Sequence, residues 1–439
     1  MSITPPITRA YIREKWQHAG FQKYLQNTGW LFTSRILCMV MSLLTTAFIA
    51  RGLGPANFGQ LSYAISFISI FSILASLGID NILYRDLIKY PDKKKEYLGS
   101  ALMIKLVAGF LTAFLIFIST FFFVQDDVSK TLILILSATF IFNAFQIINF
   151  EFQARVESKY PSIISFLVNL ILNILKIIVI INGKGVIYLA FILLLESILY
   201  ALFYWLAYEK RIQGKISDWK FNKKITINLL RDSWPFIFTS TFILVYSRID
   251  QIFIKNMVDS HAVGIYDAAA RIAEVWYFIP GIIVSSVFPA IINAKKSSEE
   301  LYYARLKKLF VTLLLIAIVI ALPVTILAPL IIKLIFGSAF TGSTIILQIY
   351  VWSCIGTFLG ILADNYLITE NFKKILLFKS FFPMVLNIIL NIIWIPRFGL
   401  VGSAYATLIS YSFGPISLVF FRQTRTKILS TIIPKKYKC

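Results

Sequence analysis

Histidine, cysteine and acidic side chains are scarce in this chain of 439 residues, which holds two histidines, three cysteines and 21 acidic residues. His18 and His261 lie near no array of cysteines or carboxylates with the spacing of metal ligands. Cys38, Cys354 and Cys439 show neither a pairing nor a metal-binding spacing. The sequence therefore predicts no metal centre and no disulfide framework, and both histidines are expected to be solvated.

A phosphate-binding loop is also absent, since no GxxxxGK[ST] motif occurs, and this excludes a Walker-type ATP site. Charged residues make up only 15% of the chain and hydrophobic residues 58%, whereas a soluble domain averages about 25% charged residues. A soluble core stops growing near about 250–300 residues and cannot hide this much apolar side chain. The sequence therefore predicts an all-α integral membrane protein.

Twelve apolar segments are long enough to cross a bilayer, which needs about 20 residues per helix. The segment 263–292 is overlong and contains Pro280, Gly281 and Pro289, so we expect a bend or a break there. The predicted spans are 29–50, 60–80, 100–124, 131–150, 161–181, 187–208, 233–254, 263–292, 309–332, 344–368, 375–395 and 401–421.

The net charge is +22, which in a soluble protein would suggest a nucleic-acid partner. Here the positions of the cations indicate membrane topology instead, and no nucleic-acid partner is predicted. Of the 43 Lys and Arg residues, 31 lie in the two tails and in alternate connections, and each of the other six connections holds only one. By the positive-inside rule, both termini are predicted to be cytoplasmic, which requires an even number of helices.

The most basic connection divides the twelve helices six and six, because it follows the sixth span and carries seven cations. Two six-helix lobes of equal orientation are therefore expected, related by an axis along the membrane normal. The predicted units are an N-terminal lobe with its cytoplasmic tail (1–208), a basic cytoplasmic linker (209–232), a C-terminal lobe (233–421) and a basic cytoplasmic tail (422–439).

The connections on the side with few cations are all short, the longest being about 333–343. Membrane enzymes that transfer glycosyl groups need a catalytic platform outside the bilayer, and these connections leave no room for one. We therefore expect a protein that is not an enzyme, without catalytic residues and without a cofactor, whose function lies in its helices.

Ionisable residues within the spans are the candidate functional residues, because burying a charge in a bilayer costs at least about 2.5–3.5 kcal/mol. Asp267, Arg271 and Glu274 are spaced i, i+4 and i+7 and form one stripe on a helix. We expect the cations to line a central cavity that receives an anionic group, and the carboxylates to balance them or to bind a coupling H⁺ or Na⁺. The candidate substrate-binding cations are Arg35, Lys176, Arg248 and Arg271, and the candidate ion-coupling or charge-balancing residues are Glu196, Asp250, Asp267, Glu274 and Asp364.

Another interpretation stays open for the candidate residues. Any one of them could belong to an internal salt bridge that ties helices together. Lys105 and Lys379 lie near the predicted cytoplasmic edge, where a lysine can extend to water, and we assign them no function. Aromatic residues such as Tyr246, Tyr266 and Trp276 could line the same cavity and stack on a bound ligand, although packing roles are the simpler interpretation.

Three stretches resemble bacterial polysaccharide-unit flippases, the Wzx-type O-antigen transporters of the multidrug/oligosaccharidyl-lipid/polysaccharide export superfamily. They are LQNTGWLFTSRILCMVMSLLTTAFIARGLGPANFGQLSYAIS (25–66), WPFIFTSTFILVYSRIDQIFIKNMVDSHAVGIYDAAARI (234–272) and IPRFGLVGSAYATLIS (395–410). The most diagnostic element contains the structural motif residues Arg51, Gly52, Gly54, Pro55 and Gly59.

The resemblance implies a MATE-like fold of two six-helix lobes in the bacterial inner (plasma) membrane. It also implies transport of undecaprenyl-pyrophosphate-linked oligosaccharide, such as O-antigen units for lipopolysaccharide, from the cytoplasmic to the periplasmic leaflet. Polymerase and chain-length proteins of the same pathway would be the partners, with the lipid bilayer as surroundings. The alternatives are a drug/cation antiporter of the same fold and an uncoupled lipid scramblase or channel.

Overall fold

A computed structural model describes residues 19–212 and 214–425, and every element in these ranges is helical. Most of the predicted tail 422–439 lies outside the described residues, as do His18 and Cys439. Among the described residues, His261 is exposed, and Cys38 and Cys354 are free thiols.

The α-helices are α2 (Ala19–Ser76), α3 (Asp80–Lys89), α4 (Lys94–Phe123), α5 (Asp127–Ser137), α6 (Thr139–Asn143), α7 (Ile147–Ala154), α8 (Lys159–Ile181), α9 (Val186–Ala207), α10 (Lys223–Met257), α11 (Ser260–Glu274), α12 (Phe278–Ser297), α13 (Glu299–Ile335), α14 (Ser343–Tyr350), α15 (Ser353–Thr369) and α16 (Lys373–Ile416).

Ten helical stretches in the described ranges are long and apolar enough to cross a membrane. Two of them, α2 and α16, each consist of two helices joined across a glycine with non-helical backbone angles. Gly54 in α2 has φ 71° and ψ 169°, and Gly399 in α16 has φ 57° and ψ −138°. Each of these stretches therefore crosses twice, which brings the number of crossings to the twelve that the sequence predicts.

The backbone at Gly54 lies in a region that only glycine occupies readily, because a Cβ atom would clash with the neighbouring peptide there. We expect Gly54→Ala to destabilise the protein by about 1–3 kcal/mol. Thermal unfolding of the purified protein in detergent measures the change. Gly29→Ala in the same helix is the control, since nothing lies within 4 Å of its added Cβ. Equal unfolding temperatures for both variants would show that the chain relaxes at Gly54 without cost.

The expected break in segment 263–292 is present, one turn before Pro280. Helix α11 ends at Glu274, a 3₁₀ turn covers Val275–Tyr277, and α12 begins at Phe278. A proline has no N–H for the carbonyl four residues earlier, so Pro280 removes the helical hydrogen bond to Trp276. The tenth span is also interrupted, between α14 and α15.

The basic connection between the halves is only partly a loop, because α10 begins at Lys223, ten residues earlier than the predicted span. The segment before α10 is attached to the first half of the chain. Lys220 N–H donates to the Lys95 carbonyl over 3.1 Å. Asn222 N–H donates to Ser100 Oγ over 3.0 Å. We infer that the start of α10 is held against α4.

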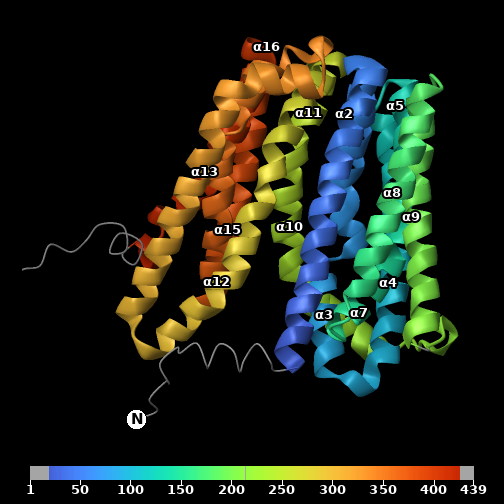
Figure 1. Ribbon diagram of the computed structural model, residues 1–439, viewed down its shortest axis with the longest axis vertical. Coiled ribbons are helices and arrows are strands. Elements are labelled where there is room, and N and C mark those ends of the chain that lie inside the picture. Colours follow the sequence, from blue (N-terminus) through green and yellow to red (C-terminus); the bar gives the residue numbers. More distant parts are fainter. Residues whose placement is uncertain (1–18, 213, 426–439) are drawn as a thin grey trace, which may run out of the picture.

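Helices α2 to α9 form one bundle, and α12 to α16 form most of the other (Figure 1). Helices α10 and α11 lie between them, α11 against α2 and α10 against both α2 and α16. We call the end of the molecule with the Gly54 kink the outer end, and the opposite end, where α2 begins and which is predicted to be cytoplasmic, the inner end. The α12–α13 hairpin diverges from α2 toward the inner end (Figure 1).

Close contact between the halves at the outer end depends on two glycines. A Cβ atom on Gly59 of α2 would lie 1.8 Å from the Ser260 carbonyl oxygen. A Cβ atom on Gly264 of α11 would lie 2.0 Å from the Pro55 carbonyl oxygen. Because the neighbouring atoms are backbone, no side-chain rearrangement can relieve either overlap. We call this contact between α2 and α11 the outer seam.

A second contact between the halves involves Arg51, whose guanidinium caps the end of α13. Its Nε donates to the Ile335 carbonyl over 2.9 Å, and its Nη2 donates to the carbonyls of Lys333 and Leu334. These carbonyls are the acceptors that the last turn of a helix leaves without partners, and a cation there is favourable. Gly52 has helical backbone angles, so its backbone does not require glycine. Space is what limits this position, because a Cβ atom added there would lie 2.2 Å from the Ile180 side chain.

Candidate functional site

Two ion pairs lie inward of the outer seam, on helices α10 and α11 between the two bundles. Arg271 Nε donates to Asp267 Oδ2 over 2.6 Å within α11. Arg248 of α10 pairs with Glu274 of α11 over 3.4 Å. Each arginine side chain keeps 32% of its surface exposed. Four of the predicted residues are therefore brought together, and their cations remain partly accessible.

Asp267 is the buried centre of this arrangement and joins both halves of the chain. It accepts a hydrogen bond from Ser62 Oγ of α2 over 2.7 Å and one from Gln251 Nε2 of α10 over 3.0 Å, in addition to the bond from Arg271. The guanidinium of Arg271 also lies 5.6 Å from the centre of the Phe58 ring. Arg271 is therefore positioned by contacts from α2 as well as from its own helix.

Asp250 lies in a separate environment, where all its partners are neutral. Its carboxylate accepts hydrogen bonds from Tyr266 Oη and from Asn391 Nδ2, each over 2.7 Å, and from Thr407 Oγ1. The residue is 2% exposed, and no cation pairs with it within the described part of the chain. A buried carboxylate that only neutral donors surround is costly unless it binds a proton or a cation.

The remaining predicted residues lie elsewhere. Lys176 of α8 pairs with Glu196 of α9 over 3.6 Å, inside the first bundle. Asp364 of α15 pairs with Lys379 of α16 over 2.5 Å. Arg35 is exposed on α2, and no ion pair to it occurs among the described residues. The structure thus gathers part of the candidate set at α10 and α11 and distributes the rest over both bundles.

The lysines expected to extend to water are buried instead. The Lys379 side chain is 8% exposed and also donates to the Gly360 carbonyl over 2.9 Å. The Lys105 side chain is 6% exposed and pairs with Asp80. A carboxylate within reach of each ammonium replaces the water that the lysine would otherwise have to reach. The expectation of solvent-seeking lysines was wrong for both.

Tyr266 is also unavailable for stacking on a sugar, because it is 1% exposed and its hydroxyl is bound to Asp250. Its ring packs edge-on against Tyr350, whose hydroxyl donates to Glu274 Oε1 over 3.1 Å. Tyr246 is half-buried and packs edge-on against Tyr411. Tyrosines therefore surround the ion pairs on the side of the second bundle.

Several polar residues of the site carry too little sequence signal to have been predicted. Ser62 and Gln251 are neutral polar residues, a kind that occurs at many other positions of the predicted spans. Asn387 and Asn391 offered a usable signal, since two asparagines four residues apart lie on one face of an apolar helix. Asn391 Nδ2 lies 3.2 Å from Asn387 Oδ1 and 2.7 Å from Asp250. In this chain, the asparagine pair thus marks the position of a buried carboxylate.

The fold resembles solved structures of transporters. The lipid II flippase MurJ in an inward closed conformation superposes with a TM-score of 0.70 at 18% identity, over 93% of this chain and 90% of that one. An inward-facing multidrug resistance MATE family transporter of the MOP superfamily superposes with a TM-score of 0.68 at 16% identity, over 90% of this chain and 96% of that one. The MATE-like fold and the membrane-spanning character that the sequence predicts are confirmed.

At the level of sequence, the chain is similar to a capsular polysaccharide biosynthesis protein, CapF, of Staphylococcus aureus. The two are 22% identical over 409 residues, which is 90% of this chain and 98% of that protein. The family model described as "Polysaccharide biosynthesis protein" matches residues 24–295, more than half of the chain. This chain belongs to the polysaccharide biosynthesis protein family.

Proposed function

We propose that this protein is a flippase that moves undecaprenyl-pyrophosphate-linked oligosaccharide units from the cytoplasmic to the periplasmic leaflet of a bacterial inner membrane. The observation that carries the proposal is the pair of partly exposed arginines, Arg248 and Arg271, on membrane-spanning helices between the two bundles. Each guanidinium is paired with a carboxylate and still keeps 32% of its side chain exposed, so further N–H donors face a path that water or a ligand can reach. A diphosphate linked to a sugar is an anionic group that these donors could bind.

The depths of the arginines are consistent with a path for an anionic head group. At 1.5 Å per residue, Arg271 lies roughly 16 Å inward from the start of α11. Arg35 lies roughly 24 Å inward from Arg51 and thus nearer to the inner end. Planar guanidinium groups bind phosphate through two parallel hydrogen bonds. An arginine is therefore better suited to a diphosphate than a lysine is.

The arrangement of the helices suggests how the head group crosses. The halves are in contact at the outer seam and diverge toward the inner end (Figure 1). In the proposed cycle, the head group enters from the inner end while the polyprenyl tail stays in lipid. Rocking of the two halves then opens the outer seam and closes the inner end, so that the site faces one leaflet at a time. The proposed cycle contains no covalent step.

Asp250 is the proposed site of the coupling ion. Its cage of neutral oxygen and amide groups joins α10, α11 and both parts of α16, so a bound H⁺ or Na⁺ would favour the packing of these helices. Asp267 differs, because Arg271 already balances its charge.

We expect Asp250→Asn to abolish the response of transport to an ion gradient, because the neutral amide mimics the permanently loaded state. Transport of lipid-linked oligosaccharide into proteoliposomes, with and without a proton or sodium gradient, measures the stimulation. Wild-type protein should be stimulated severalfold and the variant not at all. Asp127→Asn, which alters an exposed carboxylate at the start of α5, serves as the control and should keep the stimulation. A variant that responds to the gradient like wild type would exclude Asp250 as the coupling site.

Deletion of the gene tests the function itself. The expected result is loss of surface polysaccharide with lipid-linked units accumulating on the cytoplasmic face, and restoration by the intact gene.

The second candidate is a drug/cation antiporter, which the MATE-like fold also permits. The arginines argue against it, because their remaining N–H groups are donors suited to an anion and not to a cationic drug. Normal polysaccharide with altered drug sensitivity in the deletion strain would favour this second candidate.

A further inference from the structure

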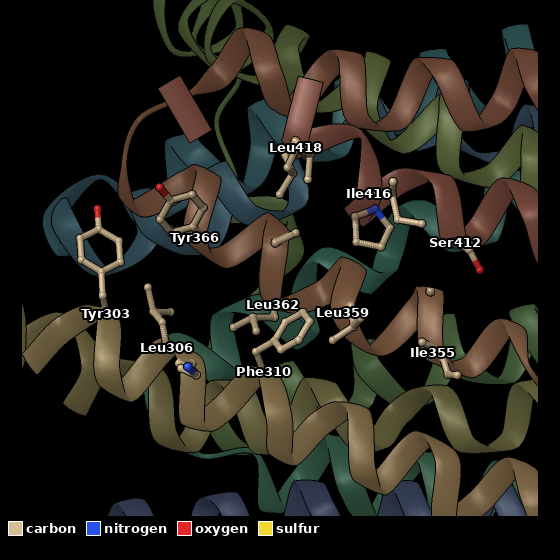
Figure 2. A pocket seen from close by; sticks show the side chains of 15 residues that line it. Tyr303, Leu306, Phe310, Ile355, Leu359, Leu362, Tyr366, Ser412, Ile416 and Leu418 are labelled. Atoms are coloured by element: carbon tan, nitrogen blue, oxygen red, sulfur yellow. The ribbon is translucent and has the colours of Figure 1, made fainter. Parts of the chain in front are cut away.

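A pocket lined mainly by hydrocarbon lies within the second bundle, away from the ion pairs. Its volume is about 370 Å³, within the range of roughly 300–1,000 Å³ typical of small-molecule sites. Tyr303 and Phe310 of α13 line one wall, and Leu359 and Tyr366 of α15 line the other (Figure 2). The last turn of α16 closes it with Ile416 (Figure 2). No lining residue belongs to α2, α10 or α11.

An exposed apolar side chain lies at the edge of the pocket. Ile416, which lines it, is 55% exposed and lies in a membrane-spanning stretch. A cavity holds water only where two or more polar groups can bind it, and these walls offer few. Hydrocarbon from the surrounding lipid is therefore the better filling, since it restores the contacts that an empty cavity lacks. The pocket is long enough for part of an acyl chain, because Ile355 and Tyr366 are eleven residues apart on α15, roughly 16 Å.

One end of the pocket is polar and carries a lysine. Lys307 lines it with a half-buried side chain, and the adjacent Lys308 is exposed. Both lysines lie in the connection 293–308, which carries five cations and is predicted to be cytoplasmic. Tyr303 and Tyr366 add hydroxyl groups at the same end (Figure 2). Basic residues near a cytoplasmic leaflet attract anionic lipid.

We propose that this pocket binds one acyl chain of an anionic phospholipid of the inner leaflet, with the lipid phosphate at the Lys307 ammonium. The site is separate from the proposed substrate path, because its walls come from α13, α15 and the end of α16. A bound chain fills the space between α13 and α15 and so stabilises the second bundle as a unit. The proposal does not depend on the transported substrate.

The test is lipid binding to the purified full-length protein, followed by native mass spectrometry. Phosphatidylglycerol and phosphatidylethanolamine with identical acyl chains are titrated separately, and undecaprenyl phosphate is added as a competitor. We expect phosphatidylglycerol to bind at least fivefold more tightly than phosphatidylethanolamine. Lys307→Gln should weaken phosphatidylglycerol binding about fivefold, whereas Lys308→Gln, one residue away and outside the pocket, should not.

A second variant tests the pocket rather than the charge. Leu359→Trp places a larger side chain in the cavity and should lower the number of retained phosphatidylglycerol molecules by one, with helical content unchanged by circular dichroism. Equal affinity for the two phospholipids, or no effect of Lys307→Gln, overturns the proposal. It is also overturned if undecaprenyl phosphate displaces phosphatidylglycerol one for one and Leu359→Trp stops transport, because the pocket would then serve the substrate tail.

Discussion

Replacing Arg271 by alanine is expected to reduce transport of lipid-linked oligosaccharide by about 10- to 150-fold. A hydrogen bond to a charged group contributes about 1.5–3 kcal/mol, and 1.4 kcal/mol corresponds to a factor of ten in affinity. When the substrate is supplied well below saturation, the rate of transport follows its affinity. The measurement is the rate at which lipid-linked units appear in the outer leaflet of proteoliposomes. Arg271→Lys should recover only part of the activity, because an ammonium cannot form two parallel bonds to phosphate.

Two controls separate binding from folding. Arg397→Ala removes an exposed arginine near the outer end and should leave transport unchanged. Arg271→Ala also leaves Asp267 buried without its cation, which by itself is destabilising. The double variant Asp267→Asn/Arg271→Gln removes both charges and avoids that penalty. If the double variant transports like wild type, Arg271 is a structural partner of Asp267, and the proposed contact with the diphosphate is wrong.

The second large effect concerns the outer seam, where we expect Gly264→Val to reduce transport at least tenfold. An added Cβ would lie 2.0 Å from the Pro55 carbonyl oxygen, so α2 and α11 must separate. The inward-facing arrangement is then disfavoured, and the cycle stops in a state open at the outer end. Gly281→Val in α12 is the matched control, since nothing lies within 4 Å of its added Cβ.

A cysteine at position 62 reports this separation directly. Ser62 is 1% exposed and bonds to Asp267 across the seam. In a chain whose native cysteines are replaced by serine, Ser62→Cys should react slowly with an impermeant maleimide added from the outer side. Adding Gly264→Val should raise that rate at least tenfold. An unchanged rate together with normal transport would mean that the helices tolerate the methyl groups and that the seam need not close this tightly.

The sequence was sufficient for the class of fold and for the twelve crossings, because apolar runs of about 20 residues have few other interpretations. It was less informative about where helices end. The start of α10 at Lys223 could not be predicted, since polar residues outside a span carry no hydropathy signal. The tight turn between the two crossings of α2 depends on the backbone angles of Gly54, and a glycine in a sequence does not reveal its φ.

For the site, spacing identified the stripe of Asp267, Arg271 and Glu274 on α11, because helical periodicity is local. The spacing could not predict which residues pair between different helices. Lys176 and Glu196 neutralise each other within the first bundle, and Asp250 has neutral partners from α16, 141 or more residues away. Which cation meets which carboxylate depends on helix rotation and depth. Neither can be read from a single sequence, and the roles assigned to these residues stay predictions.

The contact of Arg51 with α13 has a consequence for sequence variation. All three acceptors are main-chain carbonyls, those of Lys333, Leu334 and Ile335, and every residue type supplies such a carbonyl. The side chains at these positions can therefore diverge among homologues without loss of the bond, whereas Arg51 itself cannot be replaced by a shorter or neutral residue. An insertion or deletion in the last turn of α13 would move the acceptors and break the hydrogen bonds from Arg51. Homologues that keep Arg51 should thus keep the length of this helix end more strictly than its composition.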